Sequence, residues 1–305
     1  MFREERVAMP ERSLSQDGCV EICSLSLNCR YIAAYDTESP ACLEAVRRIV
    51  RMHEKHAMPA TFFIVAQLLD ANEAEYVAML KDNPLFEIAS HSYTHMLLRD
   101  TPEFGKAGPV EQFPREIVES KKRIEEAFGR EIIGFRAPVS FVDGMKGALE
   151  ALRLLAEAQY RYVSSLAWGP SWSLPALLVR PFTYAEEGYP DLWEFPPCGW
   201  HENLLKGNND CGPVRIGLFP PAMPETIPSR YVETPEEEFA YNNKPFIDKA
   251  VAEGMPQVSL IWHPWSLNRF DPDMRMLDKT FRYVRERGLA LGTFADLLED
   301  MKRNR

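Results

Sequence analysis

The sequence of 305 residues contains little of several residue types, and each scarcity excludes a class of protein. Its 6 cysteines are too few and too unevenly placed for a small disulfide-stapled scaffold. Basic residues are outnumbered, since 35 Lys and Arg stand against 45 Asp and Glu and give a formal net charge of -10. No basic stripe interleaved with aromatic residues is present to neutralise phosphates, so we expect no nucleic-acid partner.

Long apolar runs are also missing. No segment approaches the ~18 uninterrupted apolar residues that a membrane helix needs, so we expect no membrane span. The first residues, MFREERVAMPERSLSQDG, contain no apolar core of a signal peptide, which predicts a cytoplasmic protein unless a leader has been removed. With 46% apolar and 26% charged residues, the composition is that of a globular protein with a sizeable core.

Short apolar segments alternate with amphipathic ones along most of the chain, which is the rhythm of a parallel sheet covered by helices. This predicts an α/β fold, a single distorted (β/α) barrel of seven or eight parallel strands. We expect strands at 30–36, 60–66, 85–91, 132–138, 160–166, 177–184, 192–197 and 257–263. We expect helices at 41–56, 73–82, 114–128, 144–158, 271–287 and 293–303. His53 and His56 fall in the first of these helices and are interpreted as solvated.

Residues 197–245 break this alternation with proline-rich and acidic segments such as FPPAMPETIP and TPEEEF. An insertion of this kind covers one end of a barrel, mediates contacts in a homo-oligomer or is a solvated loop. Cys198 and Cys211 flank a stretch rich in Gly and Asn, where they could form a disulfide or remain free thiols. We divide the chain into an N-terminal extension, 1–29, and a barrel, 30–305, that carries the insertion.

Histidine is scarce as well, with 6 residues, yet two of them lie four apart in EIASHSYTH. An i, i+4 pair such as His91 and His95 can face one way, although satisfied or surface histidines often show this spacing too. Asp36 and Glu38, at the end of the first predicted strand, offer one carboxylate for a metal and one for a base. The carboxyl ends of barrel strands lie at one face, so the motifs YDTES, SHSYTH, FRAPVS and WHPWS should converge there.

Taken in order, YDTES, ATFFIVA, EIASHSYTH, GFRAPVS and LIWHP resemble the motifs of the NodB-homology polysaccharide deacetylases over about residues 30–300. These are metal-dependent amide hydrolases that remove N-acetyl groups from sugars. In that family the first strand ends with adjacent aspartates, whereas Thr37 stands at the second position here. Members similar to peptidoglycan deacetylases and allantoinases have an acid, a spacer and a second acid, and Asp36-Thr37-Glu38 fits that variant.

The resemblance implies a role for each matching residue. Asp36 would be the catalytic base, and Glu38 would join His91 and His95 as a ligand of a divalent metal, zinc. Arg136 would orient Asp36 and keep it ionised. His263 in LIWHP would protonate the departing amine.

Further residues could line the site without any support from the motifs. Glu194 ends a predicted strand on the same face of the barrel. Tryptophans near the predicted strand ends could stack on a sugar or belong to the core, and these are Trp193, Trp200 and Trp265.

The function expected from these features is a metal-dependent hydrolase that removes an acyl group from a sugar or a related small amide. An allantoinase-like enzyme that opens a cyclic ureide is an alternative within the family. A catalytically silent barrel that binds a carbohydrate is an alternative of another class. A cytoplasmic location favours soluble sugars or amides over cell-wall polymer as the substrate.

Overall fold

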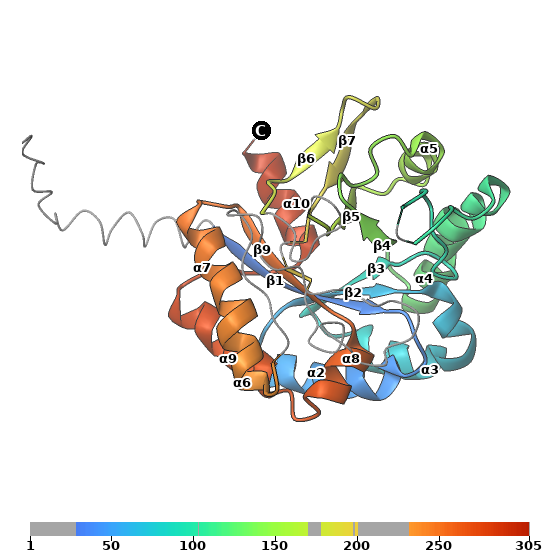
Figure 1. Cartoon of the computed structure of the whole chain (residues 1–305). Coiled ribbons are helices and arrows are strands. Elements are labelled where there is room, and N and C mark those ends of the chain that lie inside the picture. Colours follow the sequence, from blue (N-terminus) through green and yellow to red (C-terminus); the bar gives the residue numbers. More distant parts are fainter. Residues whose placement is uncertain (1–28, 103, 170–177, 198, 201–231, 305) are drawn as a thin grey trace, which may run out of the picture.

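The computed structural model describes residues 29–102, 104–169, 178–197, 199–200 and 232–304 (Figure 1). The strands are β1 (Arg30–Thr37), β2 (Ala60–Ile64), β3 (Phe86–Ser90), β4 (Gly134–Phe141), β5 (Tyr162–Leu166), β6 (Phe182–Tyr184), β7 (Tyr189–Glu194), β8 (Gly199–Trp200), β9 (Gln257–Trp262) and β10 (Ala290–Leu291). The α-helices are α2 (Cys42–His56), α3 (Leu69–Leu80), α4 (Ser120–Phe128), α5 (Leu149–Glu157), α6 (Pro235–Glu238), α7 (Lys244–Ala252), α8 (Pro264–Phe270), α9 (Arg275–Glu286) and α10 (Phe294–Arg303). Short 3₁₀ or π turns are η1 (Ala66–Leu68), η2 (Val110–Gln112), η3 (Arg115–Glu119) and η6 (Phe239–Asn243).

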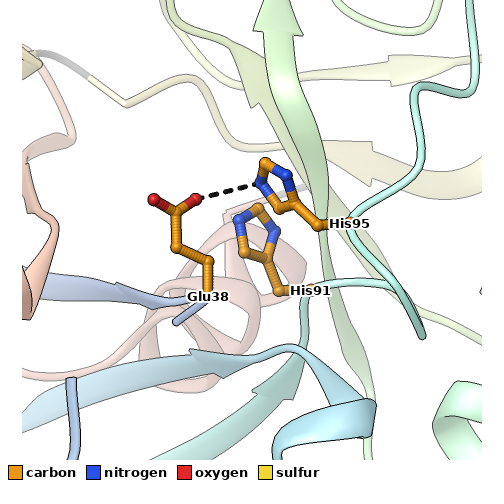
Figure 2. A group of neighbouring side chains, drawn as sticks. All are labelled: Glu38, His91 and His95. Carbon is orange, nitrogen blue, oxygen red and sulfur yellow. Dashed lines mark ion pairs between the residues drawn. The ribbon is translucent and has the colours of Figure 1, made fainter. Parts of the chain in front are cut away.

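The strands form one sheet in the order β6-β7-β5-β4-β3-β2-β1-β9-β8, and β10 pairs with the start of β1. Its strand pairs are parallel except for β6 with β7. The predicted α/β fold with its parallel strands is therefore confirmed. Because β1 and β3 flank β2 in the same direction, their carboxyl ends meet at one edge, which Figure 2 enlarges.

The two ends of the sheet approach each other along residues 189–197 and 199–200. After β7 pairs with β5, the Phe195 carbonyl accepts a hydrogen bond from the Ser164 hydroxyl at 2.7 Å. The next carbonyl, of Pro196, accepts one from the Gln257 amide at 2.7 Å, and β8 then pairs with β9. This one stretch of chain bridges β5 and β9 and gives the sheet its distorted barrel shape.

Side chains of β1 alternate between two cores, as the period of a strand requires. Ile32 and Ala34 belong to the inner cluster, together with rings from β5, β7 and α10. Tyr31, Ala33 and Tyr35 belong to the larger cluster that the strands share with the surrounding helices. Position 36 continues the inner series, so the strand delivers Asp36 to the interior of the barrel.

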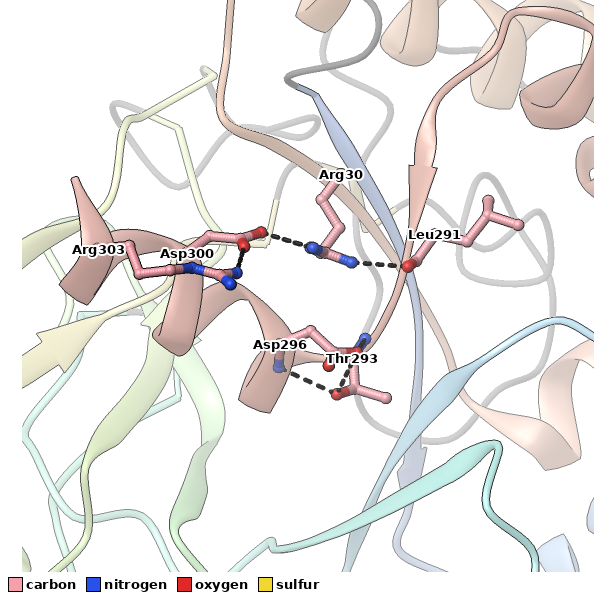
Figure 3. A network of polar contacts seen from close by, with 6 residues as sticks. All are labelled: Arg30, Leu291, Thr293, Asp296, Asp300 and Arg303. Carbon is pink, nitrogen blue, oxygen red and sulfur yellow. Dashed lines mark hydrogen bonds and ion pairs between the residues drawn. The ribbon is translucent and has the colours of Figure 1, made fainter.

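Helix α10 covers the amino end of the barrel (Figure 3). Arg30, at the start of β1, donates from Nη2 to Asp300 Oδ2 at 2.6 Å and from Nη1 to the Leu291 carbonyl at 2.6 Å. A capping box between Thr293 and Asp296 begins the helix and satisfies its first amides. The carboxyl ends of the strands, where the site lies, are therefore at the opposite end of the barrel from the one that α10 covers.

Some of the expectations from the sequence concern residues outside the described part of the chain, namely residues 1–28, residues 201–231 and the cysteines Cys198 and Cys211. Cys42 is a free, buried thiol, and Cys29 is buried as well. Residues 232–245 of the predicted insertion contain α6, η6 and the start of α7, and the division into an extension and a barrel stays a prediction. No helix in the described part of the chain is long and apolar enough to cross a membrane.

The interpretation of His53 as solvated is wrong. Residues 42, 46, 49 and 53 form the buried stripe of α2, and the stripe places the imidazole in the core. Its Nδ1 lies 2.7 Å from the Met58 carbonyl, and its Nε2 lies 2.6 Å from the Tyr35 hydroxyl. Burial lowers the pKa of His53 to about 3, so this neutral ring fastens α2 to β1.

The buried ring predicts how stability depends on pH. The unfolded chain binds a proton to His53 below its ordinary pKa of 6.5, whereas the folded protein does not until about pH 3. The stabilisation of the fold by the neutral His53 ring is fully present above pH 6.5 and is lost as the pH falls towards 3. Over that range the free energy of unfolding changes by up to about 1.4 kcal/mol per pH unit. Denaturant unfolding between pH 7 and 4 should show a shallower slope for His53→Gln, and equal slopes would contradict the assignment.

Candidate functional site

Three side chains with metal-binding atoms meet at the carboxyl ends of β1 and β3 (Figure 2). His95 Nε2 lies 3.1 Å from Glu38 Oε2, and the rings of His91 and His95 are 4.7 Å apart between centroids. One ligand atom from each of the three residues lies within 4.8 Å of the other two. Two imidazoles and one carboxylate are the donor set of many catalytic zinc sites, so these residues fit a divalent metal.

A turn after β3, rather than a helix or strand, gives the two histidines a common direction. Ser92 and His95 both adopt left-handed backbone conformations, with φ of 64° each. The Ser92 hydroxyl accepts a hydrogen bond from the His95 amide at 2.9 Å. The i, i+4 spacing predicted the pairing of the rings but not this local geometry.

Glu116 in η3 holds that turn, and the sequence analysis did not identify it. Its carboxylate accepts hydrogen bonds from the amides of Tyr93 at 3.1 Å and Thr94 at 2.9 Å, and from the Thr94 hydroxyl at 2.7 Å. Glu116 is 1% exposed and sits beside the buried Ile117. A charged residue on the apolar face of an amphipathic helix is the signal that could have revealed it.

His91 is fixed in the form that binds metals. Its Nδ1 lies 3.0 Å from the Arg136 carbonyl, which can only accept, so the proton resides on Nδ1 and Nε2 is left with a lone pair. Burial, the largest influence, lowers the pKa of His91 to about 4. The ring is therefore neutral near pH 7.

Asp36 and Arg136 form a buried pair beside the histidines. Arg136 Nε lies 3.7 Å from Asp36 Oδ1, and His91 Nε2 lies 4.0 Å from Asp36 Oδ2. The guanidinium is fully buried over the Phe63 ring, 4.3 Å from its centroid, and burial lowers its pKa. Among the described residues neither Asp36 Oδ1 nor any guanidinium nitrogen has a hydrogen-bond partner. A buried polar atom without a hydrogen-bond partner destabilises a fold by about 1–3 kcal/mol. These atoms therefore indicate a place where water or a polar ligand binds.

Glu38 also contacts two residues that follow β9. His263 Nε2 lies 3.6 Å from Glu38 Oε2, and the Trp265 indole donates to Glu38 Oε1 at 3.1 Å. Burial raises the pKa of Glu38, but His263 and the His95 hydrogen bond outweigh it and hold that pKa well below its ordinary value. Glu38 is thus a carboxylate ready to bind a cation.

The structure therefore brings together the six residues expected from the motifs, which are Asp36, Glu38, His91, His95, Arg136 and His263. Trp265, expected only as a lining residue, contacts Glu38 directly.

The other candidate lining residues have contacts elsewhere. Glu194 is fully buried and accepts hydrogen bonds from the Ser165 amide at 2.7 Å and hydroxyl at 2.6 Å. Trp193 is 6% exposed and stacks on Phe195, with centroids 5.9 Å apart. The backbone of Trp200 pairs with β9, and its side chain lies outside the described residues. Site-lining roles for these three residues stay predictions.

Backbone strain is concentrated in β4 just after Arg136. Val139 and Ser140 have φ of 67° and 60°, and the β4–β5 register shifts between Arg136 and Phe141. A β-branched residue in this conformation is rare, and such residues cost about 1–3 kcal/mol. The Trp168 indole donates to the Val139 carbonyl at 2.8 Å and supports this shape. Strain kept by surrounding structure is typical of functional sites.

Comparison with known proteins finds a match to one family model and similarity to several solved structures. The model described as polysaccharide deacetylase matches residues 31–163, which hold all of the motif residues except His263. A search of the curated proteins found no match.

Solved structures share the fold over most of their length. A probable polysaccharide deacetylase from Pseudomonas aeruginosa PAO1 is 15% identical, with 90% of each chain covered and a TM-score of 0.58. A putative polysaccharide deacetylase from Mycobacterium smegmatis is 17% identical, with 95% of this chain and 98% of that chain covered and a TM-score of 0.52. The Puue allantoinase is 12% identical, with 89% and 88% covered and a TM-score of 0.58. At these identities the likeness to the solved structures concerns the fold, and residues 31–163, which bear most of the motifs, match the polysaccharide deacetylase family model.

Proposed function

We propose that this protein is a metal-dependent hydrolase that removes an N-acetyl or similar acyl group from a sugar or a related small amide. The observation that carries the proposal is the meeting of Glu38, His91 and His95, within 4.8 Å, beside the buried Asp36–Arg136 pair. The family match over the strands that bear these residues supports it.

Glu38, His91 and His95 would hold the metal, and their donor types favour zinc. When bound, a divalent cation polarises the amide carbonyl and makes water easier to deprotonate near neutral pH. His91 is already held in its neutral form with Nε2 available, and Glu38 is held as an anion. Little rearrangement of these side chains is then needed for binding.

Asp36 would act as the base. Its Oδ2 lies 4.0 Å from His91 Nε2, so it borders the metal-binding atoms without being one of the three. It would accept the proton of the water that attacks the carbonyl carbon, while Arg136 orients the carboxylate.

His263 would act as the acid. Its Nε2 lies 3.6 Å from Glu38 Oε2, and it follows β9, which pairs with β1 on the side away from β2 and β3. The carbon–nitrogen bond breaks after the new carbon–oxygen bond has formed, and the protonated His263 gives its proton to the departing nitrogen. The products are a carboxylic acid and a free amine.

The spacing Asp36-Thr37-Glu38 keeps an allantoinase-like ureide hydrolase as a second candidate. Metal-stripped and metal-loaded protein should be assayed in parallel on N-acetylated sugars and on a cyclic ureide. Turnover of the sugars that requires metal supports the deacetylase, and metal-independent opening of the ureide supports the alternative. Binding of a carbohydrate without turnover of either class would support a silent barrel.

The two carboxylates of YDTES should respond differently to neutralisation. Asp36→Asn should retain the metal, because it changes only the proton acceptor, and should lower turnover by about 10²–10⁴-fold. Glu38→Gln should weaken metal binding first, because an amide oxygen is a poorer partner for a divalent cation than a carboxylate. Metal content by mass spectrometry and turnover of an N-acetylated sugar test both, and the opposite pattern would exchange their roles.

His91→Ala and His95→Ala should each abolish stoichiometric metal binding and leave the fold intact, because the core of the barrel does not depend on these rings. Circular dichroism and calorimetric titration with zinc measure the two properties. His56→Ala is the matched control, since His56 contacts Asp278 rather than the site and should bind zinc as wild type does. Unfolding of both site variants would indicate a structural metal instead.

A further inference from the structure

The long side chain of Glu38 can place its carboxylate in more positions than the side chain of an aspartate could. Its side chain rotates about three bonds, and it extends from the residue just past the end of β1. It is 18% exposed on the side-chain scale, so packing alone does not immobilise it. A specific contact is needed to fix which oxygen faces the histidines.

Trp265 supplies that contact. The indole N–H is a donor only, so the 3.1 Å contact with Glu38 Oε1 has one possible direction, and the ionised acceptor strengthens it. Trp265 lies in the first turn of α8, which contacts both α2 and β1, and its ring packs partly buried against the large core cluster. The donor is therefore mounted on a rigid element.

The two carboxylate oxygens of Glu38 therefore have different partners. Oε1 faces the indole, whereas Oε2 lies 3.1 Å from His95 Nε2 and 3.6 Å from His263 Nε2. A free carboxylate can bind a cation through one oxygen or through both. The indole hydrogen bond directs Oε1 towards Trp265 and leaves Oε2 as the oxygen that faces the histidines and would bind the metal.

We propose that Trp265 is a positioning residue that makes Glu38 a one-oxygen ligand. One carboxylate oxygen and two imidazoles fill three coordination positions and leave the others open for water and substrate. Loss of the indole donor frees Oε1 to bind as well and fills one of those positions. This inference rests on the metal binding in the proposed function and adds a determinant of its geometry.

Cobalt(II) titration of the full-length protein tests the inference, with affinity from calorimetry and geometry from the visible absorption spectrum. Cobalt absorbs more strongly in four- or five-coordinate sites than in six-coordinate ones. Trp265→Phe should lower the cobalt affinity about 10–100-fold, as loss of a contact to a ligand typically does, and should weaken the visible bands. Trp265→Leu, which also lacks a donor, should give the same result if the Phe variant folds poorly.

Two further variants separate this role from a general effect on structure. Tyr283→Phe removes an aromatic hydrogen-bond donor that contacts Asp248 rather than the site, and it should leave affinity and spectrum unchanged. In a Glu38→Ala background, which has no acceptor for the indole, Trp265→Phe should cause no further loss of affinity, because its effect passes through the Glu38 side chain.

The outcomes also distinguish this inference from the proposed function. If the wild-type protein binds no cobalt, the metal-dependent function fails. If the wild type binds cobalt and Trp265→Phe leaves affinity and spectrum as they were, only the role of Trp265 is overturned. The role of Trp265 is also overturned if Trp265→Phe lowers the cobalt affinity by the same factor in the wild type and in the variant that lacks the Glu38 carboxylate.

Discussion

The site depends on the hydrogen-bonded register of β1 with its two neighbours. Asp36 lies opposite Phe63 of β2, and Tyr35 lies opposite Trp262 of β9, so His263 emerges beside the carboxylates. Ile64 of β2 lies opposite Ser90 of β3, which places His91 at the same level. A slip of one residue in β1 would turn Asp36 towards the helices. The inner packing of Ile32 and Ala34 therefore specifies where the chemistry can occur.

Burial and neighbouring charges together set the protonation states of the metal-binding side chains. Burial of His91 favours its neutral form, while the neighbouring histidines favour the ionised form of Glu38. Arg136 is deep in the barrel against aromatic rings, with Asp36 as its only ion-pair partner among the described residues. Removal of either member of this pair would leave the other as an uncompensated buried charge.

Much of the fold and the composition of the site followed from the sequence. Apolar runs predicted the main strands because strands buried on both faces need such runs, and polar residues after them predicted the shared edge. His53 was wrongly interpreted as solvated because of its polar character, although the spacing of residues 42, 46, 49 and 53 places it on the buried stripe of α2. Glu116 could have been noticed from its charge on the apolar face of an amphipathic segment, but its contact with the left-handed turn could not be predicted, because it joins two different elements. The same is true of Trp265, whose partner is 227 positions away.

The seam formed by residues 189–197 and 199–200 has a consequence for local motion. The β5–β7 ladder and the β8–β9 ladder lie on either side of Phe195 and Pro196, and between them the Ser164 and Gln257 side chains bind the two successive carbonyls. Bonds from individual side chains break one at a time, whereas a ladder opens cooperatively. Opening of the barrel should therefore begin at this seam at a lower free energy than global unfolding. Amide hydrogens there should exchange with solvent while those of β1 and β2 remain protected, so the barrel can widen on one side without disturbing the strands that carry the site.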